Sequence, residues 1–158
     1  MAMAHTILPL RALHYIKRAY PSRFETAFHY LFYQFWSPGN LNLTRPENLI
    51  KALSEVSVGF KGHDGNGSKT KLFSADEVKA IMAGAGSQEM KDALKAATQQ
   101  ALEHGAFGAP WFWANNDKGK SEPFFGSDRF HFLYKFLDLP FQDVALLPPK
   151  LGTEKSKL

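Results

Sequence analysis

The residue types that could do chemistry are limited by what the chain lacks. It contains no cysteine, which excludes disulfides, thiolate metal sites and a Cys-x-x-Cys redox mechanism carried by this chain. It contains six histidines, but no two stand at the close spacing that places two imidazoles on one metal ion. No Gly-x-Ser-x-Gly sequence occurs, so a hydrolase nucleophile has no candidate. We therefore expect no metal site.

The loop at 62–70 suggests two ligand-binding motifs but matches neither. A P-loop needs Lys directly after its second glycine and a strand before its first, whereas Ser68 follows Gly67 here and a helix is expected upstream. An EF-hand loop needs glycine where Lys69 stands and a later bidentate Glu, which is absent. The sequence therefore predicts a solvated surface loop.

Two short segments are more informative. The first, Gly-Ala-Phe-Gly-Ala-Pro at 105–110, places a proline after small residues, directly before an aromatic strand-like run. The second, Phe-Gly-Ser-Asp-Arg at 125–129, is typical of a helix start with a serine or aspartate cap. By composition alone the two segments are a turn and an N-cap. Their order also resembles the second half of a thioredoxin fold, whose proline peptide is cis.

Most elements that position these segments are predicted helices. Apolar residues recur at helical spacing over about 6–20, 22–36, 44–56, 74–86 and 87–104. Capping boxes are predicted at Ser22, Thr44 and Ser74, and simple N-caps at Thr6 and Ser87. The helix at 22–36 is expected to be central, because its other sides are also apolar. Its inward face is predicted to hold Phe24, Ala27, Phe28, Leu31, Phe32 and Phe35.

After Gly105 the pattern changes from helix to hairpin. Residues 109–114 and 123–125 predict two antiparallel strands around a turn at 115–120, and 126–137 predicts a last amphipathic helix. An isolated hairpin with two open edges is marginal in water. We therefore expect another segment to pair with it.

Composition excludes several classes of protein. The chain has 158 residues, 44% of them hydrophobic, which suffices for a core. No stretch approaches the roughly 18 apolar residues of a membrane span, and the charged N-terminal residues do not suit a signal peptide. The net charge of +4 comes from scattered Lys and Arg, so binding to nucleic acid is not expected.

From about Thr6 to Leu139 the chain resembles the kappa-class glutathione transferases and the related 2-hydroxychromene-2-carboxylate isomerases. The helices up to Ala101 are similar to their all-helical insertion, and the segments at 105–110 and 125–129 carry the most specific similarity. The resemblance implies a DsbA-like thioredoxin fold. The predicted fold class is thus α+β and helix-dominated: a partial thioredoxin-like fold of β-hairpin plus C-terminal helix with a helical insertion. The predicted domains are 6–104, 105–140 and a flexible tail at 141–158.

The resemblance also implies a ligand, glutathione, as co-substrate and without a metal. The backbone of Ala109, before cis-Pro110, would pair with the cysteinyl part as an added strand does. Ser127 and Asp128 would hold the γ-glutamyl end, since helix amides suit a carboxylate and Asp128 can accept hydrogen bonds from an ammonium group. Arg129 matches the family pattern and is assigned a structural role.

One departure from the family pattern bears on catalysis. In the family an N-terminal βαβ unit supplies two strands and the serine that stabilises the glutathione thiolate, and nothing before Thr6 matches that unit. We therefore leave the catalytic residue unassigned and expect weak glutathione binding with little catalysis by this chain. The missing strand would also account for a hairpin without a partner.

The last three residues, Ser156, Lys157 and Leu158, match the peroxisomal import signal. We expect peroxisomal localisation through the import receptor, with the cytoplasm as the alternative. The predicted function is conjugation of glutathione to small hydrophobic electrophiles by a homodimer. Two alternatives stay open: a non-catalytic binding or interaction protein, and a glutathione-dependent isomerase.

Overall fold

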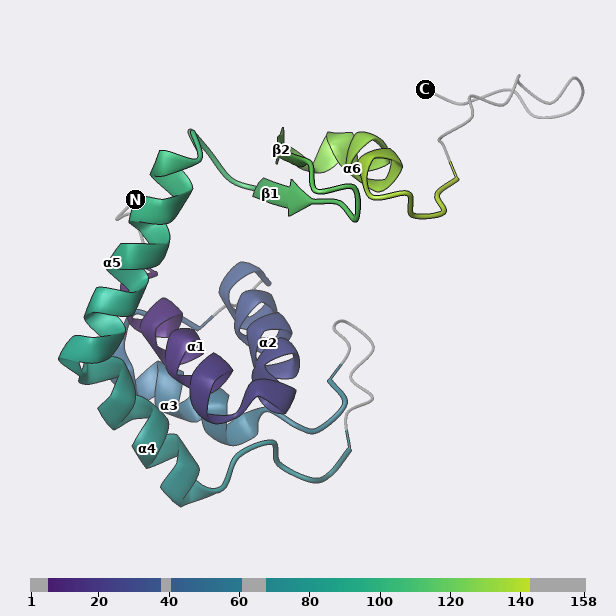
Figure 1. The fold of residues 1–158 in the computed structure, drawn as a ribbon. Coiled ribbons are helices and arrows are strands. Elements are labelled where there is room, and N and C mark those ends of the chain that lie inside the picture. Colours follow the sequence, from purple (N-terminus) through teal and green to yellow (C-terminus); the bar gives the residue numbers. More distant parts are fainter. Residues whose placement is uncertain (1–5, 38–40, 61–67, 143–158) are drawn as a thin grey trace, which may run out of the picture. The chain divides into compact units, whose positions relative to one another are not determined.

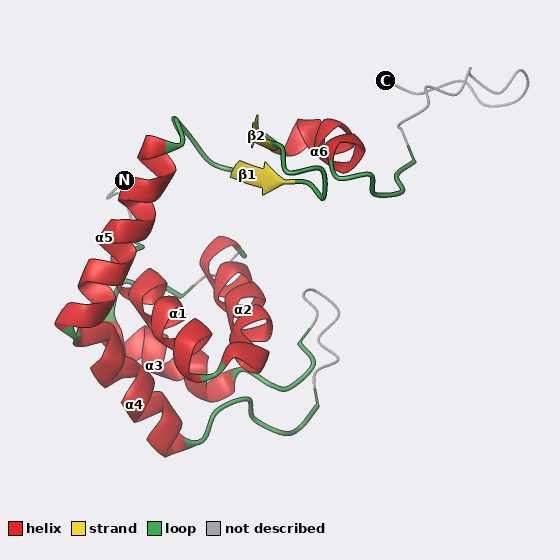
Figure 2. Ribbon diagram, in the orientation of Figure 1, coloured by secondary structure: helices red, strands yellow, loops and turns green. Residues whose placement is uncertain are grey.

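The computed structural model describes residues 6–37, 41–60 and 68–142. The chain divides into two compact units, Met1–Gln100 and Ala101–Leu158 (Figure 1). The fold is α+β and dominated by helix, as predicted, and the described residues contain one two-stranded antiparallel sheet (Figure 2). The domain limits at 104 and 140 stay predictions. Nearly all of the predicted tail at 141–158, including Ser156, Lys157 and Leu158, lies outside the described residues.

The first unit is built from helices around one apolar core. Its elements are α1 (Ile7–Ala19), a 3-10 turn (Pro21–Arg23), α2 (Phe24–Trp36), α3 (Pro46–Glu55), α4 (Ala75–Gly86) and α5 (Gln88–Glu103), whose last turn belongs to the second unit. Both α1 and α3 pack against α2 and α4. The largest fully buried side chains of this core are Ile16, Leu43, Leu49, Leu53, Ile81 and Val56.

The inward face of α2 differs from the prediction. Phe28 and Phe32 were expected in the core but are 38% and 57% exposed, whereas Ala27, Tyr30 and Leu31 are buried. An apolar pattern selects a face only when the opposite face is polar, and α2 is apolar on most sides. The neighbouring helices therefore decide the orientation, and they pack against the side that carries the small Ala27.

Two of the predicted caps form as expected. Ser74 and Glu77 make the reciprocal capping box of α4: the Ser74 hydroxyl accepts from the Glu77 N–H at 3.3 Å, and the Glu77 carboxylate accepts from the Ser74 N–H at 2.8 Å. Ser87 caps α5 by accepting from the Met90 N–H at 3.2 Å.

The other three predicted caps were wrong. Thr6 makes no side-chain cap bond at the start of α1. Ser22 lies inside the 3-10 turn, and α2 begins at Phe24. The Thr44 hydroxyl donates to the Asn42 side-chain oxygen at 2.6 Å, so it stabilises the turn before α3 instead of the helix start.

Arg23 joins three segments of the first unit. Its Nη1 donates to the Leu72 carbonyl at 3.0 Å and to the Glu77 carboxylate at 2.9 Å. Its guanidinium also lies over the rings of Tyr20 and Phe73, 5.4 and 5.8 Å from their centroids. One side chain thus connects the α1–α2 turn to the start of α4.

The loop at 62–70 lies mostly outside the described residues. Its flanks are held together by an isolated antiparallel bridge between Ser57 and Lys71. Leu72 N–H also donates to the Val56 carbonyl at 2.9 Å. These bonds bring the end of α3 close to the start of α4.

The second unit consists of a hairpin and a short helix. Its elements are β1 (Trp111–Asn115), β2 (Ser121–Phe125), a 3-10 turn (Ser127–Arg129) and α6 (Phe130–Phe136). Gly105 ends α5 with φ +82, the left-handed conformation that a helix C-terminus favours, and its N–H bonds to the Leu102 carbonyl at 2.9 Å. The hairpin is confirmed, and the last helix starts later than predicted because a 3-10 turn precedes it.

Close packing of α1 on α4 requires a glycine at one position. A Cβ atom built on Gly84 would overlap the Tyr15 ring, whereas one built on Gly86 would meet nothing within 4 Å. Gly84→Ala is expected to lower the free energy of unfolding by about 1–3 kcal/mol through this overlap. Gly86→Ala, the matched control, is expected to be neutral or stabilising by up to about 1 kcal/mol. Urea denaturation measures both, and equal effects at the two positions would contradict the packing argument.

The capping box of α4 predicts a pH dependence of stability. The hydrogen bond from the Ser74 N–H, assisted by Arg23, holds the pKa of the Glu77 carboxyl below its usual value. A lowered folded-state pKa stabilises the fold above the unfolded-state pKa and ceases to do so as the pH falls through the folded-state value. Glu77→Gln is therefore expected to cost about 0.5–1 kcal/mol near neutral pH. The cost should vanish as the pH falls well below about 4.3, the usual pKa of Glu.

Denaturation of the wild type and Glu77→Gln across this pH range tests the expectation. Asp76→Asn is the matched control, because its carboxylate is 94% exposed and lies 3.5 Å from Lys79. It should change stability less at every pH. A difference between wild type and Glu77→Gln that stays constant down to acidic pH would be evidence against the role of the ionised carboxylate.

Candidate functional site

The register of the hairpin brings the two predicted site segments together. Trp111 lies opposite Phe125 at the end of the ladder. One residue further, the Gly126 N–H donates to the Pro110 carbonyl at 3.1 Å. Ala109 and Pro110 therefore lie across the open end of the hairpin from the segment that begins at Gly126, and Ser127 and Asp128 follow directly.

The segment before β1 is tightly placed and accessible. The Ala109–Pro110 peptide is cis, as the thioredoxin resemblance implied. A Cβ atom at Gly108 would come within 2.8 Å of the Phe125 ring, so a larger residue at this position would require the ring to move. Ala109 and Pro110 are both exposed. The Ala109 backbone is thus open to a ligand in extended conformation.

The segment after β2 folds back on itself. Gly126 has φ +94, and a Cβ atom there would meet the Asp128 carboxylate, so glycine is needed both for the conformation and for the contact. Ser127 and Asp128 are exposed. Ser127 was expected to cap a helix, but the structure has a 3-10 turn here and no side-chain cap bond. The Ser127 hydroxyl and the Asp128 carboxylate are thus open to solvent.

Hydrogen-bonded and non-bonded pairs alternate along an antiparallel ladder. The Gly126–Pro110 and Asn116–Lys120 hydrogen bonds, at 3.1 and 3.0 Å, show which pairs are the hydrogen-bonded ones. The backbone groups of Trp111, Trp113 and Asn115 therefore point away from β2. No strand pairs with this edge among the residues that the structure describes.

The outer edge of β2 is different. By the same alternation, the backbone groups of Ser121, Pro123 and Phe125 point away from β1 and form this edge. Pro123 has no N–H, so the edge lacks its central donor, a feature that discourages further strand pairing. The edge that accepts a strand is therefore that of β1, and it continues directly into Ala109.

Aromatic side chains cover the hairpin unequally. On one face, Phe112 packs against Phe130 and Phe124 against Phe136, each pair with ring centroids 5.5 Å apart, so α6 covers this face. On the other face, Trp111 and Phe125 meet Phe107, with centroid distances of 5.5 and 4.6 Å. Phe107 is 76% exposed. The second face is thus covered only by short-range aromatic contacts within 101–142.

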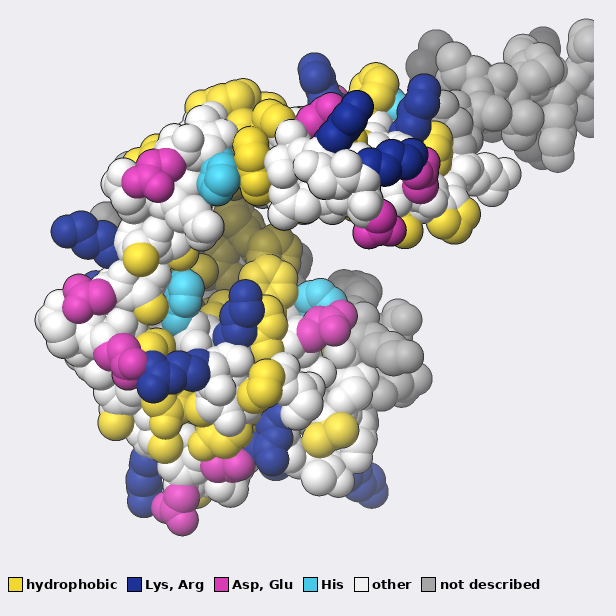
Figure 3. Space-filling model, viewed as in Figure 1, with side chains coloured by type: hydrophobic (Ala, Val, Ile, Leu, Met, Phe, Trp, Pro, Cys, Tyr) yellow, Lys and Arg dark blue, Asp and Glu magenta, His cyan; other side chains and the backbone are white. Residues whose placement is uncertain are grey.

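The charged side chains visible in one view do not gather into a positive surface for a polyanion. On the face shown in Figure 3, Lys and Arg lie scattered over the first unit, and those of the second unit are interspersed with acidic side chains. Within the described parts of the chain, no three His, Cys, Asp or Glu side chains are grouped to hold a metal ion. None of the described helices is both long and apolar enough to cross a membrane.

Comparison with known proteins points to one class, the kappa glutathione S-transferases. The chain is 39% identical over 61 residues to glutathione S-transferase kappa 1 of Caenorhabditis elegans, an alignment covering 39% of this chain and 25% of the relative. It is 27% identical over 128 residues to glutathione S-transferase kappa 1 of Homo sapiens, covering 81% of this chain and 49% of the relative. The chain thus spans at most about half the length of these relatives. No family model matches the chain.

Proposed function

We propose that this chain is part of a kappa-type glutathione S-transferase of the DsbA-like thioredoxin superfamily and that it binds glutathione at the open end of its hairpin. The similarity to two kappa-class relatives supports the class of ligand. The observation that carries the site is the hydrogen bond from Gly126 to Pro110, because it places Ala109 and Asp128 at the same end of the hairpin.

The binding mode follows from the exposed groups. The Ala109 backbone continues the open edge of β1, so the cysteinyl part of glutathione can pair with it as a short added strand. Asp128 is an exposed carboxylate and accepts charge-assisted hydrogen bonds from the γ-glutamyl ammonium group. The Ser127 hydroxyl donates to the γ-glutamyl carboxylate of glutathione, which lies next to that ammonium group.

The proposed reaction is attack of the glutathione thiolate on a small hydrophobic electrophile. A free thiol has a pKa of about 8.5, so a hydrogen-bond donor is needed to keep the sulfur ionised near neutral pH. The family pattern assigns that role to a serine of an N-terminal unit. We assign it to no residue of this chain, and we include no metal in the proposal.

A second candidate is supported by the open edge of β1. An interaction protein would use this edge to accept a strand from a second copy or from another chain. Isomerase chemistry would use the same glutathione site and differ only in the pocket for the second substrate.

Glutathione titration calorimetry tests the proposed site. Asp128→Ala is expected to weaken binding about tenfold or more, since it removes the charged partner of the ammonium group. Lys69→Ala is the matched control, because Lys69 is also exposed and charged but lies in the first unit, and it should leave binding unchanged. Equal affinities of the wild type and Asp128→Ala would refute the site.

Conjugation of a chloronitrobenzene by the same preparations separates the candidate functions. Turnover that depends on Asp128 supports the transferase. Glutathione binding without turnover supports a binding protein. Self-association without glutathione binding supports an interaction protein whose β1 edge accepts a strand from a second copy.

We also propose that Ser156, Lys157 and Leu158 direct the protein to peroxisomes if they form its C-terminus. A fluorescent protein fused to the N-terminus of the chain should then enter peroxisomes, and removal of these three residues should leave it in the cytoplasm. Peroxisomal import of the shortened fusion would rule the signal out.

A further inference from the structure

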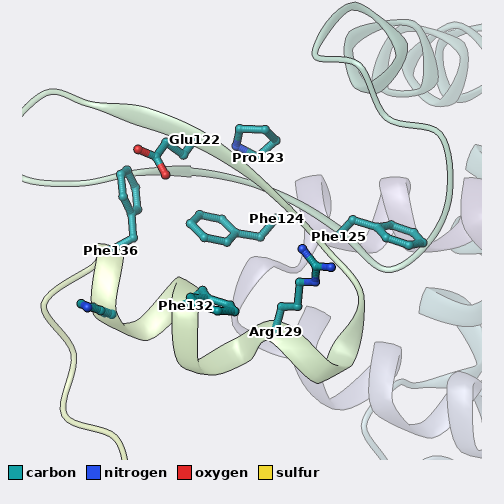
Figure 4. Close-up of a pocket in the computed structure, with 8 residues that line it drawn as sticks. Glu122, Pro123, Phe124, Phe125, Arg129, Phe132 and Phe136 are labelled. Carbon is teal, nitrogen blue, oxygen red and sulfur yellow. The ribbon is translucent and has the colours of Figure 1, made fainter.

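A groove between β2 and α6 has no role in the proposed glutathione site. Its volume is about 490 Å³. The residues that line it are Glu122, Pro123, Phe124, Phe125, Arg129, Phe132, Lys135 and Phe136 (Figure 4). Phe124, Phe132 and Phe136 form its apolar walls, and Phe132 is 54% exposed. A groove of this size with aromatic walls suits a small ligand with a flat or extended apolar body.

The groove lining carries more positive than negative side chains. Arg129 and Lys135 both line it, and neither side chain makes a hydrogen bond or ion pair with another described residue. Arg129 thus lacks the polar side-chain contacts that its expected structural role would use. Lys118, elsewhere in this unit, is instead paired with Asp138 at 2.7 Å. Glu122 is the one acidic side chain of the lining, and in Figure 4 it lies at the opposite end of the groove from Arg129. The lining therefore carries one more positive than negative charge.

We propose that this groove binds a small molecule with an aryl or acyl body and a single acidic group. The apolar body would be buried against the three phenylalanines. The acidic group would lie at Arg129, since a guanidinium binds a carboxylate through paired hydrogen bonds. Glu122 would repel a second acidic group at the far end, so the site discriminates against diacids.

This inference does not rest on the proposed function. The groove is formed by β2 and α6, whereas glutathione is placed at Ala109 and Asp128 on the open end of the hairpin. Asp128→Ala should therefore weaken glutathione binding and leave the groove ligand bound. The two proposals can fail separately.

A matched ligand series tests the groove. The isotope-labelled full chain is titrated by NMR with naphthoate, with the neutral alcohol naphthalene methanol and with naphthalene dicarboxylate. Naphthoate is expected to bind at least about threefold more tightly than the alcohol or the diacid. The shifted resonances should include Phe124, Phe132 and Phe136. Equal affinity for the acid and the alcohol, or shifts confined to other residues, would overturn the proposal.

Three variants identify the groups responsible. Arg129→Gln should reduce the preference for the acid about threefold, whereas Lys135→Gln, in the last turn of α6, should reduce it less. Both variants should fold normally, because neither side chain has a hydrogen bond or ion pair to lose among the described residues. Lys95→Gln on α5 is the control and should change nothing. Retention of the full acid preference in Arg129→Gln would overturn the assignment even if naphthoate binds.

Discussion

The hydrogen bond from the Gly126 N–H to the Pro110 carbonyl is the interaction on which the second unit depends. It extends the ladder one pair beyond the strands, where Pro110 has no N–H to offer in return. Together with the five pairs from Trp111–Phe125 to Asn115–Ser121, it sets the register of the hairpin, and a slip of one residue would move every aromatic side chain to the opposite face. The same bond brings Ala109 and Asp128 to one end of the hairpin.

The hairpin is asymmetric in both its faces and its edges. Phe130 and Phe136 of α6 cover one face, while Phe107 lies largely exposed on the other. Pro123 removes a donor from the edge of β2, so only the edge of β1 presents a regular row of donors and acceptors. The β1 edge is therefore the one that can accept an added strand.

The two units differ in how they are stabilised. The first has a core of fully buried aliphatic side chains, such as Ile16, Leu49 and Ile81. In the described part of the second unit, Leu133 is the one buried hydrophobic residue, and paired aromatic rings hold the elements together. A unit that buries so little apolar surface gains little stability by itself. Its exposed rings are thus available for ligands or for further chain segments.

The sequence by itself determined the elements and the segments of interest. Helical periodicity, the Ser74–Glu77 capping box and the hairpin around residues 115–120 are local signals, and each was predicted because its physical cause lies within a few residues. The cap at Thr44 was predicted wrongly because α3 begins at Pro46 with Arg45 as its N-cap residue, one position later than expected. The inward face of α2 and the groove beside Arg129 could not be predicted. Both depend on which elements pack together, since a helix that is apolar on most sides has no clearly preferred face and a groove exists only between two packed elements.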